Sequence, residues 1–345
     1  MLRSLGKFER QARLAITVTT SLIPIAVVGS LLYAAFFVKA AAMVSSVRPP
    51  AIERRDRFLG VAMPNDKVIW AAGSNGKVVR SDDGGAKWSA QTAPTAENLQ
   101  GLAAWSGEQA VAVGGGGVVI RTGDGGKTWA EVMAPKSNVA NKLLNVRAYT
   151  GGVAWAVGEM GAALRSGDFG QSWERALPEK DQAWNDIAFA GEHGVLVGEF
   201  GQVMTSDDAG KSWKAASSGV KSSLMSVYLR DAKNGAAVGL SGTILVTQDG
   251  GSHWNEIAKQ TREHLNNVIW DGSQWVAVGD KGVIVTGDAA GSTWKAGRVS
   301  EGNLGWNTQV LSVAAGDKSK GYLLAGASLS RLKDGKLSVF GRAAD

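Results

Sequence analysis

One eight-residue pattern recurs along the chain at nearly constant intervals, and this recurrence restricts the fold more than any other feature. The pattern is Ser/Thr-x-Asp-x-Gly-x-x-Trp, and one copy runs from Thr122 to Trp129. A further copy, from Thr286 to Trp294, fits with one extra residue. The Trp positions 88, 129, 173, 213, 254 and 294 are 41, 44, 40, 41 and 40 residues apart. Periods of this size are typical of solenoids, propellers and arrays.

The chemistry of the pattern is that of a tight hairpin. The Asp carboxylate can accept hydrogen bonds from backbone N–H groups two residues on, and the Gly supplies a positive φ. The hydroxyl closes the start of the turn, while the Trp begins the next strand and buries its ring against the neighbouring unit. We therefore assign a structural role to Asp83, Trp88, Asp124, Trp129, Asp168, Trp173, Asp208, Trp213, Asp249, Trp254, Asp288 and Trp294.

Each unit contains further strand signals upstream of the Trp. A small apolar strand ends in Gly and is followed by a second Gly, as in Ala71-Ala72-Gly73 with Gly76. Another strand lies further back, as in the segment from Leu144 to Ala148. Four short strands joined by Gly and Asp turns describe one blade of a β-propeller. Because a lone blade would expose two apolar faces, the blades are expected to close into a ring.

The number of blades follows from the C-terminal sequence. Six units are complete, and a seventh without the Trp can be read over 310–314, 322–325, 328–332 and 337–340. Terminal repeats are often atypical in this way. We predict an all-β fold: a seven-bladed β-propeller with Asp-box hairpins over residues 57–342, followed by a tail over 343–345.

The Asp-box pattern, together with the Val-Gly-x-x-Gly strand pair seen at Val157-Gly158 and Gly161, resembles a known family. It is similar to the photosystem II assembly/stability factors, which are seven-bladed Asp-box (BNR-type) propellers, in their bacterial non-photosynthetic branch. The resemblance covers nearly the whole chain after residue 56. It implies an architecture more than a function, because Asp boxes also occur in sialidases, sortilin-type receptors and some glucanases.

A different signal precedes the propeller. Residues 14–38 form an uncharged run of 25 residues. A helix of that length reaches about 37 Å, more than the ~30 Å hydrocarbon core of a bilayer. We predict a basic cytoplasmic N-terminus over 1–13, a transmembrane anchor over 14–38 and a linker over 39–56. A cleaved signal peptide is the alternative: the run exceeds the usual apolar region, but Ala40-Ala41-Ala42 leaves cleavage open.

The charge distribution supports this orientation. The net charge of +6 lies within residues 1–57, and the remainder holds 28 basic and 28 acidic residues. The basic residues before the uncharged run favour a cytoplasmic N-terminus, which places the propeller in the periplasm of a bacterium, on a single-pass inner-membrane anchor. A neutral propeller gives no reason to expect nucleic-acid binding. The absence of cysteine fits the periplasm.

The sequence offers little catalytic chemistry, and we predict no enzyme activity and no cofactor. Sialidases with this repeat need an arginine triad and a Tyr nucleophile paired with Glu, whereas the four Tyr residues here are 33, 149, 228 and 322. The recurring Asp residues are assigned to turns rather than to a carboxylate pair. The three histidines, 193, 253 and 264, are scattered, so no metal site is expected.

One set of arginines is a candidate interface. Aligned on the Asp box, the residue before the Ser/Thr is Arg in blades 1, 2, 3 and 7, and Thr205, Val246 and Val285 in blades 4 to 6. In a closed ring these arginines would form one arc, and guanidinium groups suit carboxylates, phosphates and anionic protein tails. The resembling family has an arginine patch used for binding. The alternative is that each Arg packs on a Trp or bonds a turn carbonyl. The candidates are Arg80, Arg121, Arg165 and Arg331.

Together these features predict a non-catalytic, membrane-anchored periplasmic propeller that serves as an accessory or assembly subunit of a membrane protein complex. The resemblance implies a transporter of the resistance-nodulation-division (RND) class as the partner. A glycan- or lipid-binding module is the second hypothesis, and a sialidase-like glycoside hydrolase is the third.

Overall fold

A computed structural model describes residues 22–24, 26–33, 49–313 and 321–341. The chain divides into two compact units, Met1–Pro49 and Pro50–Asp345. The described part of the first unit is a short helix over 22–24 and 26–33. Among the described residues, no helix combines the length and apolar character needed to cross a membrane. Most of the predicted anchor and linker, the basic N-terminus and the tail lie outside the described residues, so these assignments remain predictions.

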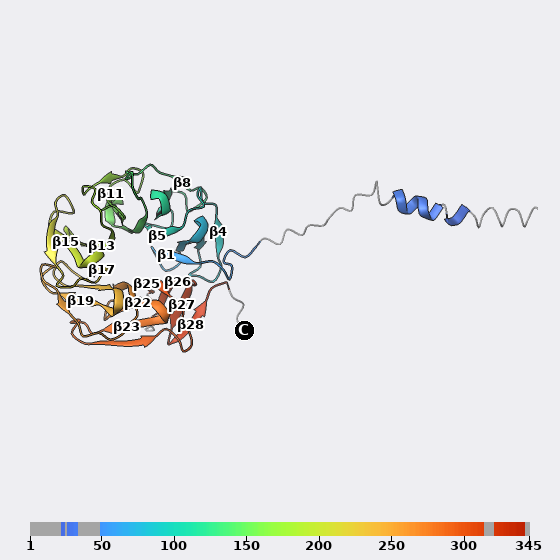
Figure 1. The fold of residues 1–345 in the computed structure, drawn as a ribbon. Coiled ribbons are helices and arrows are strands. Elements are labelled where there is room, and N and C mark those ends of the chain that lie inside the picture. Colours follow the sequence, from blue (N-terminus) through green and yellow to red (C-terminus); the bar gives the residue numbers. More distant parts are fainter. Residues whose placement is uncertain (1–21, 25, 34–48, 314–320, 342–345) are drawn as a thin grey trace, which may run out of the picture. The chain divides into compact units, whose positions relative to one another are not determined.

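The described residues of the second unit form seven four-stranded antiparallel sheets arranged in a ring (Figure 1). Blades 1 to 3 contain β1 (Phe58–Ala62), β2 (Ile69–Gly73), β3 (Val78–Ser81), β4 (Ser89–Gln91), β5 (Leu99–Ala104), β6 (Ala110–Gly114), β7 (Val119–Thr122), β8 (Ala130–Glu131), β9 (Leu143–Ala148), β10 (Ala154–Gly158), β11 (Ala163–Ser166) and β12 (Glu174–Arg175). Blades 4 and 5 contain β13 (Trp184–Ala190), β14 (His193–Gly198), β15 (Gln202–Ser206), β16 (Lys214–Ser217), β17 (Leu224–Leu229), β18 (Gly235–Gly239), β19 (Ile244–Thr247) and β20 (Asn255–Glu256). Blades 6 and 7 contain β21 (Leu265–Trp270), β22 (Trp275–Gly279), β23 (Val283–Gly287), β24 (Trp294–Arg298), β25 (Asn307–Val313), β26 (Gly321–Gly326), β27 (Ser330–Lys333) and β28 (Lys336–Val339). The predicted seven-bladed propeller is confirmed.

Each blade takes its four strands from one continuous segment, so the ring is closed without strand exchange. Blade 1 lies beside blade 7, where the light-blue β1 is next to the red strands of blade 7 in Figure 1. The Val61 amide donates to Gln309 Oε1 at 2.7 Å, and the Thr308 hydroxyl donates to the Leu59 carbonyl at 3.0 Å. Ile52, which falls in the predicted linker, is buried in the apolar cluster shared by these two blades.

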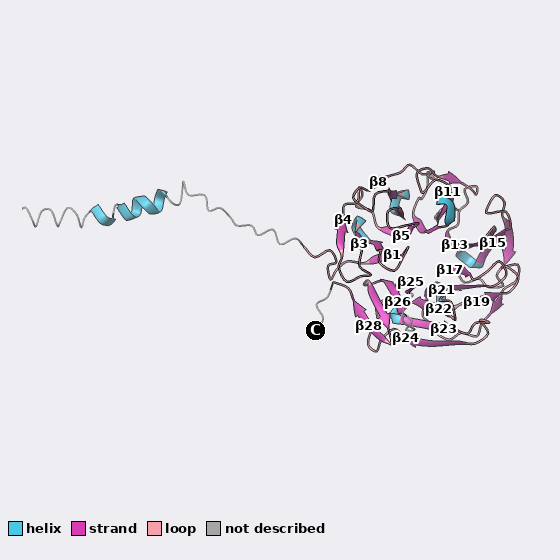
Figure 2. Ribbon diagram, turned by 180° about the vertical axis from the view of Figure 1, so that it is seen from behind, coloured by secondary structure: helices cyan, strands magenta, loops and turns pink. Residues whose placement is uncertain are grey.

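The antiparallel order gives the ring two different faces (Figure 2). One face, here called the hairpin face, carries the loops between the first and second strands and the Asp-containing hairpins between the third and fourth. The other, the turn face, carries the linkers between blades and the short 3-10 turns η1 (Ser74–Gly76), η2 (Gly115–Gly117), η4 (Glu199–Gly201), η5 (Leu240–Gly242) and η6 (Asp280–Gly282). A further 3-10 turn, η3 (Thr150–Gly152), lies in a loop on the hairpin face.

The hairpins are held by hydrogen bonds of the recurring residues. In blade 2, Thr122 Oγ1 donates to Asp124 Oδ1 at 2.9 Å and accepts from the Gly126 amide at 2.9 Å. The Asp124 carboxylate accepts from the Thr128 amide, four residues on, at 3.0 Å rather than two residues on as expected. Blades 1, 3, 4 and 5 repeat this arrangement.

The hairpin of blade 6 differs from the sequence alignment. Gly287, not Thr286, pairs with the first residue of the second strand, which is the place of the Ser/Thr in the other blades. This hairpin is therefore as long as the others, and Asp288 lies one residue earlier in it. The apparent extra residue is a change in the position of the Asp, not an insertion. The position of Arg80 is consequently occupied by Thr286 instead of Val285.

The hairpin carboxylates should make the stability of the fold depend on pH in the acidic range. Hydrogen bonds, first of all from the Thr128 and Ser212 side chains, lower the pKa of Asp124 and Asp208 from 3.8 to about 2. A lowered folded-state pKa stabilises the fold above the unfolded-state pKa, and this contribution is lost as pH falls from about 4 to about 2. The urea midpoint should fall over this interval, and Asp124→Asn should reduce the fall. An unchanged midpoint would contradict the prediction.

Candidate functional site

A ring of structurally equivalent residues surrounds the centre of the propeller. In each innermost strand, the strand pairing is interrupted by a β-bulge between the first and third residues, and the third residue then resumes pairing. We call these third residues the collar. The collar consists of Gly60, Gly101, Asn145, Asp186, Ser226, Asn267 and Gln309.

The polar members of the collar join each blade to the next. Asn267 Oδ1 accepts from the Val310 amide at 3.0 Å, and Asp186 Oδ2 accepts from the Val227 amide at 3.0 Å. The equivalent amides of Val146 and Ile187 instead donate to the collar side chain of their own blade, at 2.8 Å in both cases. The collar thus satisfies the backbone of the innermost strands and fixes the spacing between blades.

Glycine occupies the collar in blades 1 and 2 because the next backbone takes the space of a side chain. A Cβ at Gly60 would lie 2.5 Å from the Leu102 amide nitrogen, and one at Gly101 would lie 2.9 Å from that of Val146. The collar is therefore polar on one side of the ring and tightly packed on the other.

Asp186 is the centre of the polar part of the collar. Its fully buried carboxylate accepts from Asn145 Nδ2 at 2.7 Å, from the Ser226 hydroxyl at 2.8 Å and from Arg147 Nε and Nη2 at 2.8 and 2.6 Å. Arg147 Nη2 also donates to the Val227 carbonyl at 3.1 Å. Asp186 therefore connects blades 3, 4 and 5 and holds the Arg147 guanidinium at two points.

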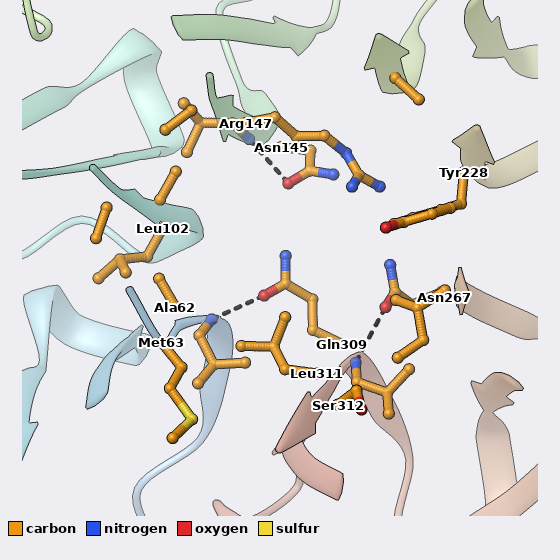
Figure 3. A pocket seen from close by; sticks show the side chains of 18 of the residues that line it. Ala62, Met63, Leu102, Asn145, Arg147, Tyr228, Asn267, Gln309, Leu311 and Ser312 are labelled. Carbon is orange, nitrogen blue, oxygen red and sulfur yellow. Dashed lines mark hydrogen bonds between the residues drawn. The ribbon is translucent and has the colours of Figure 1, made fainter. Parts of the chain in front are cut away.

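Arg147 projects into a cavity of about 460 Å³ at the centre of the hairpin face (Figure 3). It is the one charged residue among those described as lining this cavity, with Tyr149, Tyr228 and Gln309 as further polar neighbours. Burial disfavours the guanidinium charge, but the attraction of Asp186 exceeds this effect and raises the pKa of Arg147. Burial also raises the pKa of Tyr149, which keeps its hydroxyl neutral. The cavity thus presents hydrogen-bond donors, one of them permanently charged.

A second chamber of about 200 Å³ lies on the turn-face side of the collar. It shares Asn145, Asn267 and Gln309 with the central cavity, and its wall adds the amides of Gln100, Asn185 and Asn266. The two chambers differ in chemistry: one contains a guanidinium and aromatic rings, and the other contains neutral amides.

An aromatic groove of about 750 Å³ extends from the central cavity over blades 2 to 4 on the hairpin face. Tyr149 and Phe189 line both the cavity and the groove. Further out, the groove is lined by Trp105, Phe169 and Arg165. Arg147 and Arg165 therefore line two adjoining cavities that share an aromatic wall.

Most of the predicted arginine arc is used in contacts between blades. The Arg80 side chain is 13% exposed, lies 4.5 Å from the centre of the Trp70 ring and donates to the Gly125 carbonyl at 2.9 Å, in the hairpin of blade 2. Arg121 donates to the Phe169 carbonyl at 3.2 Å, and Arg331 donates to the Gly84 carbonyl. These contacts are of the kind expected if each Arg packs on a Trp or bonds a turn carbonyl, the alternative to partner binding given above. Docking of a partner on these three arginines remains an untested prediction.

Arg165 differs from the other three arginines. It reaches Glu174 of its own blade at 3.4 Å, its side chain is 37% exposed, and it lines the aromatic groove. In blades 4 and 5, other side chains contact the next hairpin: His193 Nε2 lies 2.8 Å from the Gly250 carbonyl oxygen, and Arg230 donates to the Ala289 carbonyl at 2.7 Å. The sequence alignment missed these two contacts because the side chains start from other strands.

Because of this difference, the Arg80 and Arg165 variants should lose different amounts of stability. Arg80→Ala should lower the unfolding free energy by about 1–3 kcal/mol, because it removes a stacked guanidinium and leaves turn carbonyls without their donor. Arg165→Ala should change it by less than about 0.5 kcal/mol. Urea denaturation of both variants measures the contrast, and equal losses would argue against it.

The sequence analysis missed Arg147 and Asp186. Both residues lie in strands that it identified, and the available signal was one residue of each charge sign in the inner strands of two adjacent blades. Among the described residues, no group of three or more His, Asp or Glu side chains is suited to hold a metal ion.

No protein-family model and no curated protein sequence matches the chain. Solved structures do match. The fold is similar to that of YCF48. The structure of YCF48 bound to D1 peptide has a TM-score of 0.65 at 16% identity over 81% of this chain and 93% of that chain. YCF48 from Cyanidioschyzon merolae has a TM-score of 0.64 at 15% identity, covering 82% of this chain and 96% of that one.

Two propellers of other functions are also similar. The WD40 propeller domain of Doa1 has a TM-score of 0.63 at 10% identity, covering 83% of this chain and 95% of that one. An ancestral GH74 enzyme has a TM-score of 0.56 at 16% identity, covering 68% of this chain and 36% of that one. At these identities the likeness establishes the fold alone.

Proposed function

We propose that this protein is a non-catalytic accessory subunit whose propeller binds a segment of a partner protein on the hairpin face. The observation that carries the proposal is Arg147, a single charged side chain held by Asp186 and directed into the central cavity. The adjoining aromatic groove supports a polypeptide rather than a compact ligand, because it extends the site toward Arg165.

The chemistry of the site favours a carboxylate-bearing segment. Arg147 uses Nε and Nη2 on Asp186 and Val227, and within the described chain its Nη1 makes no hydrogen bond to protein. A guanidinium fixed in this way can donate to a carboxylate without losing side-chain entropy on binding. The aromatic wall would hold apolar side chains of the same segment. That YCF48 has been solved with a D1 peptide supports peptide binding on this fold.

The location of the partner is proposed from the sequence. The uncharged run over 14–38 and the basic residues before it support an inner-membrane anchor with the propeller in the periplasm. An anchor would raise the effective concentration of the propeller near a membrane-embedded partner. An RND-class transporter is the partner we propose, and this rests on the family resemblance.

The test is affinity purification of the full-length protein in mild detergent, with mass spectrometry of the co-purified proteins. We expect a stoichiometric multispan protein. Ser312→Trp, at the exposed edge of the cavity, should lose it, whereas Ala130→Trp, on the outer strand β8, should retain it. Retention by both variants would reject the central cavity as the site. A protein purified alone would reject the accessory role.

A glycan- or lipid-binding module is the second candidate, and the amide chamber on the turn-face side favours the glycan form. Neutral amides such as Gln100 and Asn185 can bond to sugar hydroxyls in either direction. Binding of polysaccharide by the full-length protein, lost in Gln100→Leu and unchanged in Ser312→Trp, would support this function over the first.

A further inference from the structure

A separate pocket of about 310 Å³ lies on the turn face between blades 3 and 4. The blade linker over 177–182 forms one wall, and β15 and β16 form the other. None of its lining residues lines the central cavity, the amide chamber or the aromatic groove. It is therefore independent of the site proposed above.

The pocket combines an inner-strand Trp that blade 4 does not share with the other blades and a small residue on the outer strand. Its inner strand begins with Trp184, where other blades have Phe58, Leu99, Leu143, Leu224, Leu265 or Asn307. On the outer strand, Ala215 pairs with Met204 at a place where blades 1 and 6 also have Ala, whereas blades 2, 3 and 5 have Glu131, Arg175 and Glu256. A small residue opposite Met204 leaves the space above the Trp184 ring open.

One buried polar atom in this pocket has no partner. The Gln182 side chain lines the pocket, the residue is 8% exposed, and its Oε1 makes no hydrogen bond in the described chain. The backbone of Gln182 is held by two hydrogen bonds. Its backbone N–H donates to the Lys180 carbonyl at 2.8 Å, and its backbone carbonyl accepts from the Gly161 N–H at 2.7 Å. A buried acceptor without a donor costs free energy, and a ligand that supplies the donor removes this cost.

We infer that the pocket binds an uncharged aromatic ring that carries one N–H or O–H donor, of the indole or phenol class. Leu177, Trp184, Val203 and Met204 provide an apolar wall for the ring, and Gln182 Oε1 accepts from its donor. Glu179 and Lys180 are exposed at the rim, so the interior itself is uncharged and excludes ionised groups. The ring can come from a free small molecule or from a Trp or Tyr side chain of a partner.

The test uses two ring systems of the same shape. Indole has an N–H group, and benzothiophene has none. By calorimetric titration of the full-length protein in detergent, wild type should bind indole about tenfold more tightly than benzothiophene, the effect of one hydrogen bond to a buried acceptor. Gln182→Leu should bind both equally, and Ala215→Trp, which fills the space beside Met204, should bind neither.

Controls separate the outcomes. Gln100→Leu, in the amide chamber, should keep the indole preference. N-acetyl-tryptophanamide binding as well as indole would identify a partner side chain as the source, and its exclusion would identify a free molecule. Equal binding of indole and benzothiophene to wild type, a preference that survives Gln182→Leu, or no binding to wild type would each overturn the inference.

Discussion

Asp186→Asn is expected to lower the unfolding free energy by about 3–5 kcal/mol, the usual cost of breaking a buried ion pair from one side. The substitution keeps the shape of the side chain but removes the fully buried counter-charge of the Arg147 guanidinium, which is itself largely buried. It also weakens the links that the carboxylate makes to blades 3 and 5. Urea denaturation followed by circular dichroism measures the change.

Two comparisons make this prediction specific. Asp66→Asn, at an exposed loop position, should change stability by less than about 0.5 kcal/mol. Arg147→Met should cost less in the Asp186→Asn background than in wild type, because the two side chains act as a pair. A loss at Asp186 no larger than at Asp66, or strictly additive effects in the double variant, would show that the collar does not hold the ring together.

Trp70→Ala should have an effect of similar size, about 3–5 kcal/mol, through lost packing instead of lost charge pairing. Trp70 is fully buried, and its ring meets the Trp129 ring edge-on at 5.6 Å between centroids and lies under the Arg80 guanidinium. Removing it leaves a cavity between blades 1 and 2. Thermal and urea denaturation both report the loss.

Trp88→Ala is the matched control in the same blade. Trp88 is only half-buried, with its ring 5.1 Å from that of Phe340 and its Nε1 bonded to the Gly85 carbonyl at 3.1 Å. Its replacement should cost clearly less than the replacement of Trp70. Equal losses would contradict the prediction, because the half-buried hairpin Trp would then contribute as much to stability as the fully buried second-strand Trp.

The repeat made the architecture predictable, because each copy encodes the same local geometry. The hairpin needs a hydroxyl, an Asp and a Gly within five residues, so its chemistry is written in adjacent positions. The same locality limited the alignment in blade 6: the motif placed Thr286 in the hydroxyl position, whereas strand pairing places Gly287 there. Pairing is set by the neighbouring strand, which a motif does not contain.

The arginine arc shows a second limit of prediction from the sequence. The sequence correctly aligned Arg80, Arg121 and Arg165 on successive blades, but could not tell which of them has a carbonyl of the next blade within reach. That depends on the distance between blades, to which every packed side chain contributes. The Arg165 side chain is 37% exposed and lines a groove, whereas the Arg80 side chain is 13% exposed.

By itself the sequence determined the repeat, the number of blades, the hairpin residues and the neutral charge of the propeller, since all of these are local or additive properties of the chain. Only the tertiary structure decided that Arg147 meets Asp186 at the centre of the ring and that Gln182 faces an open pocket between blades. Arg147 and Asp186 lie on different blades, and the space beside Gln182 depends on the size of residues about 20 or more positions away in the sequence. Their meeting is fixed by ring closure and interblade packing, which no short pattern records.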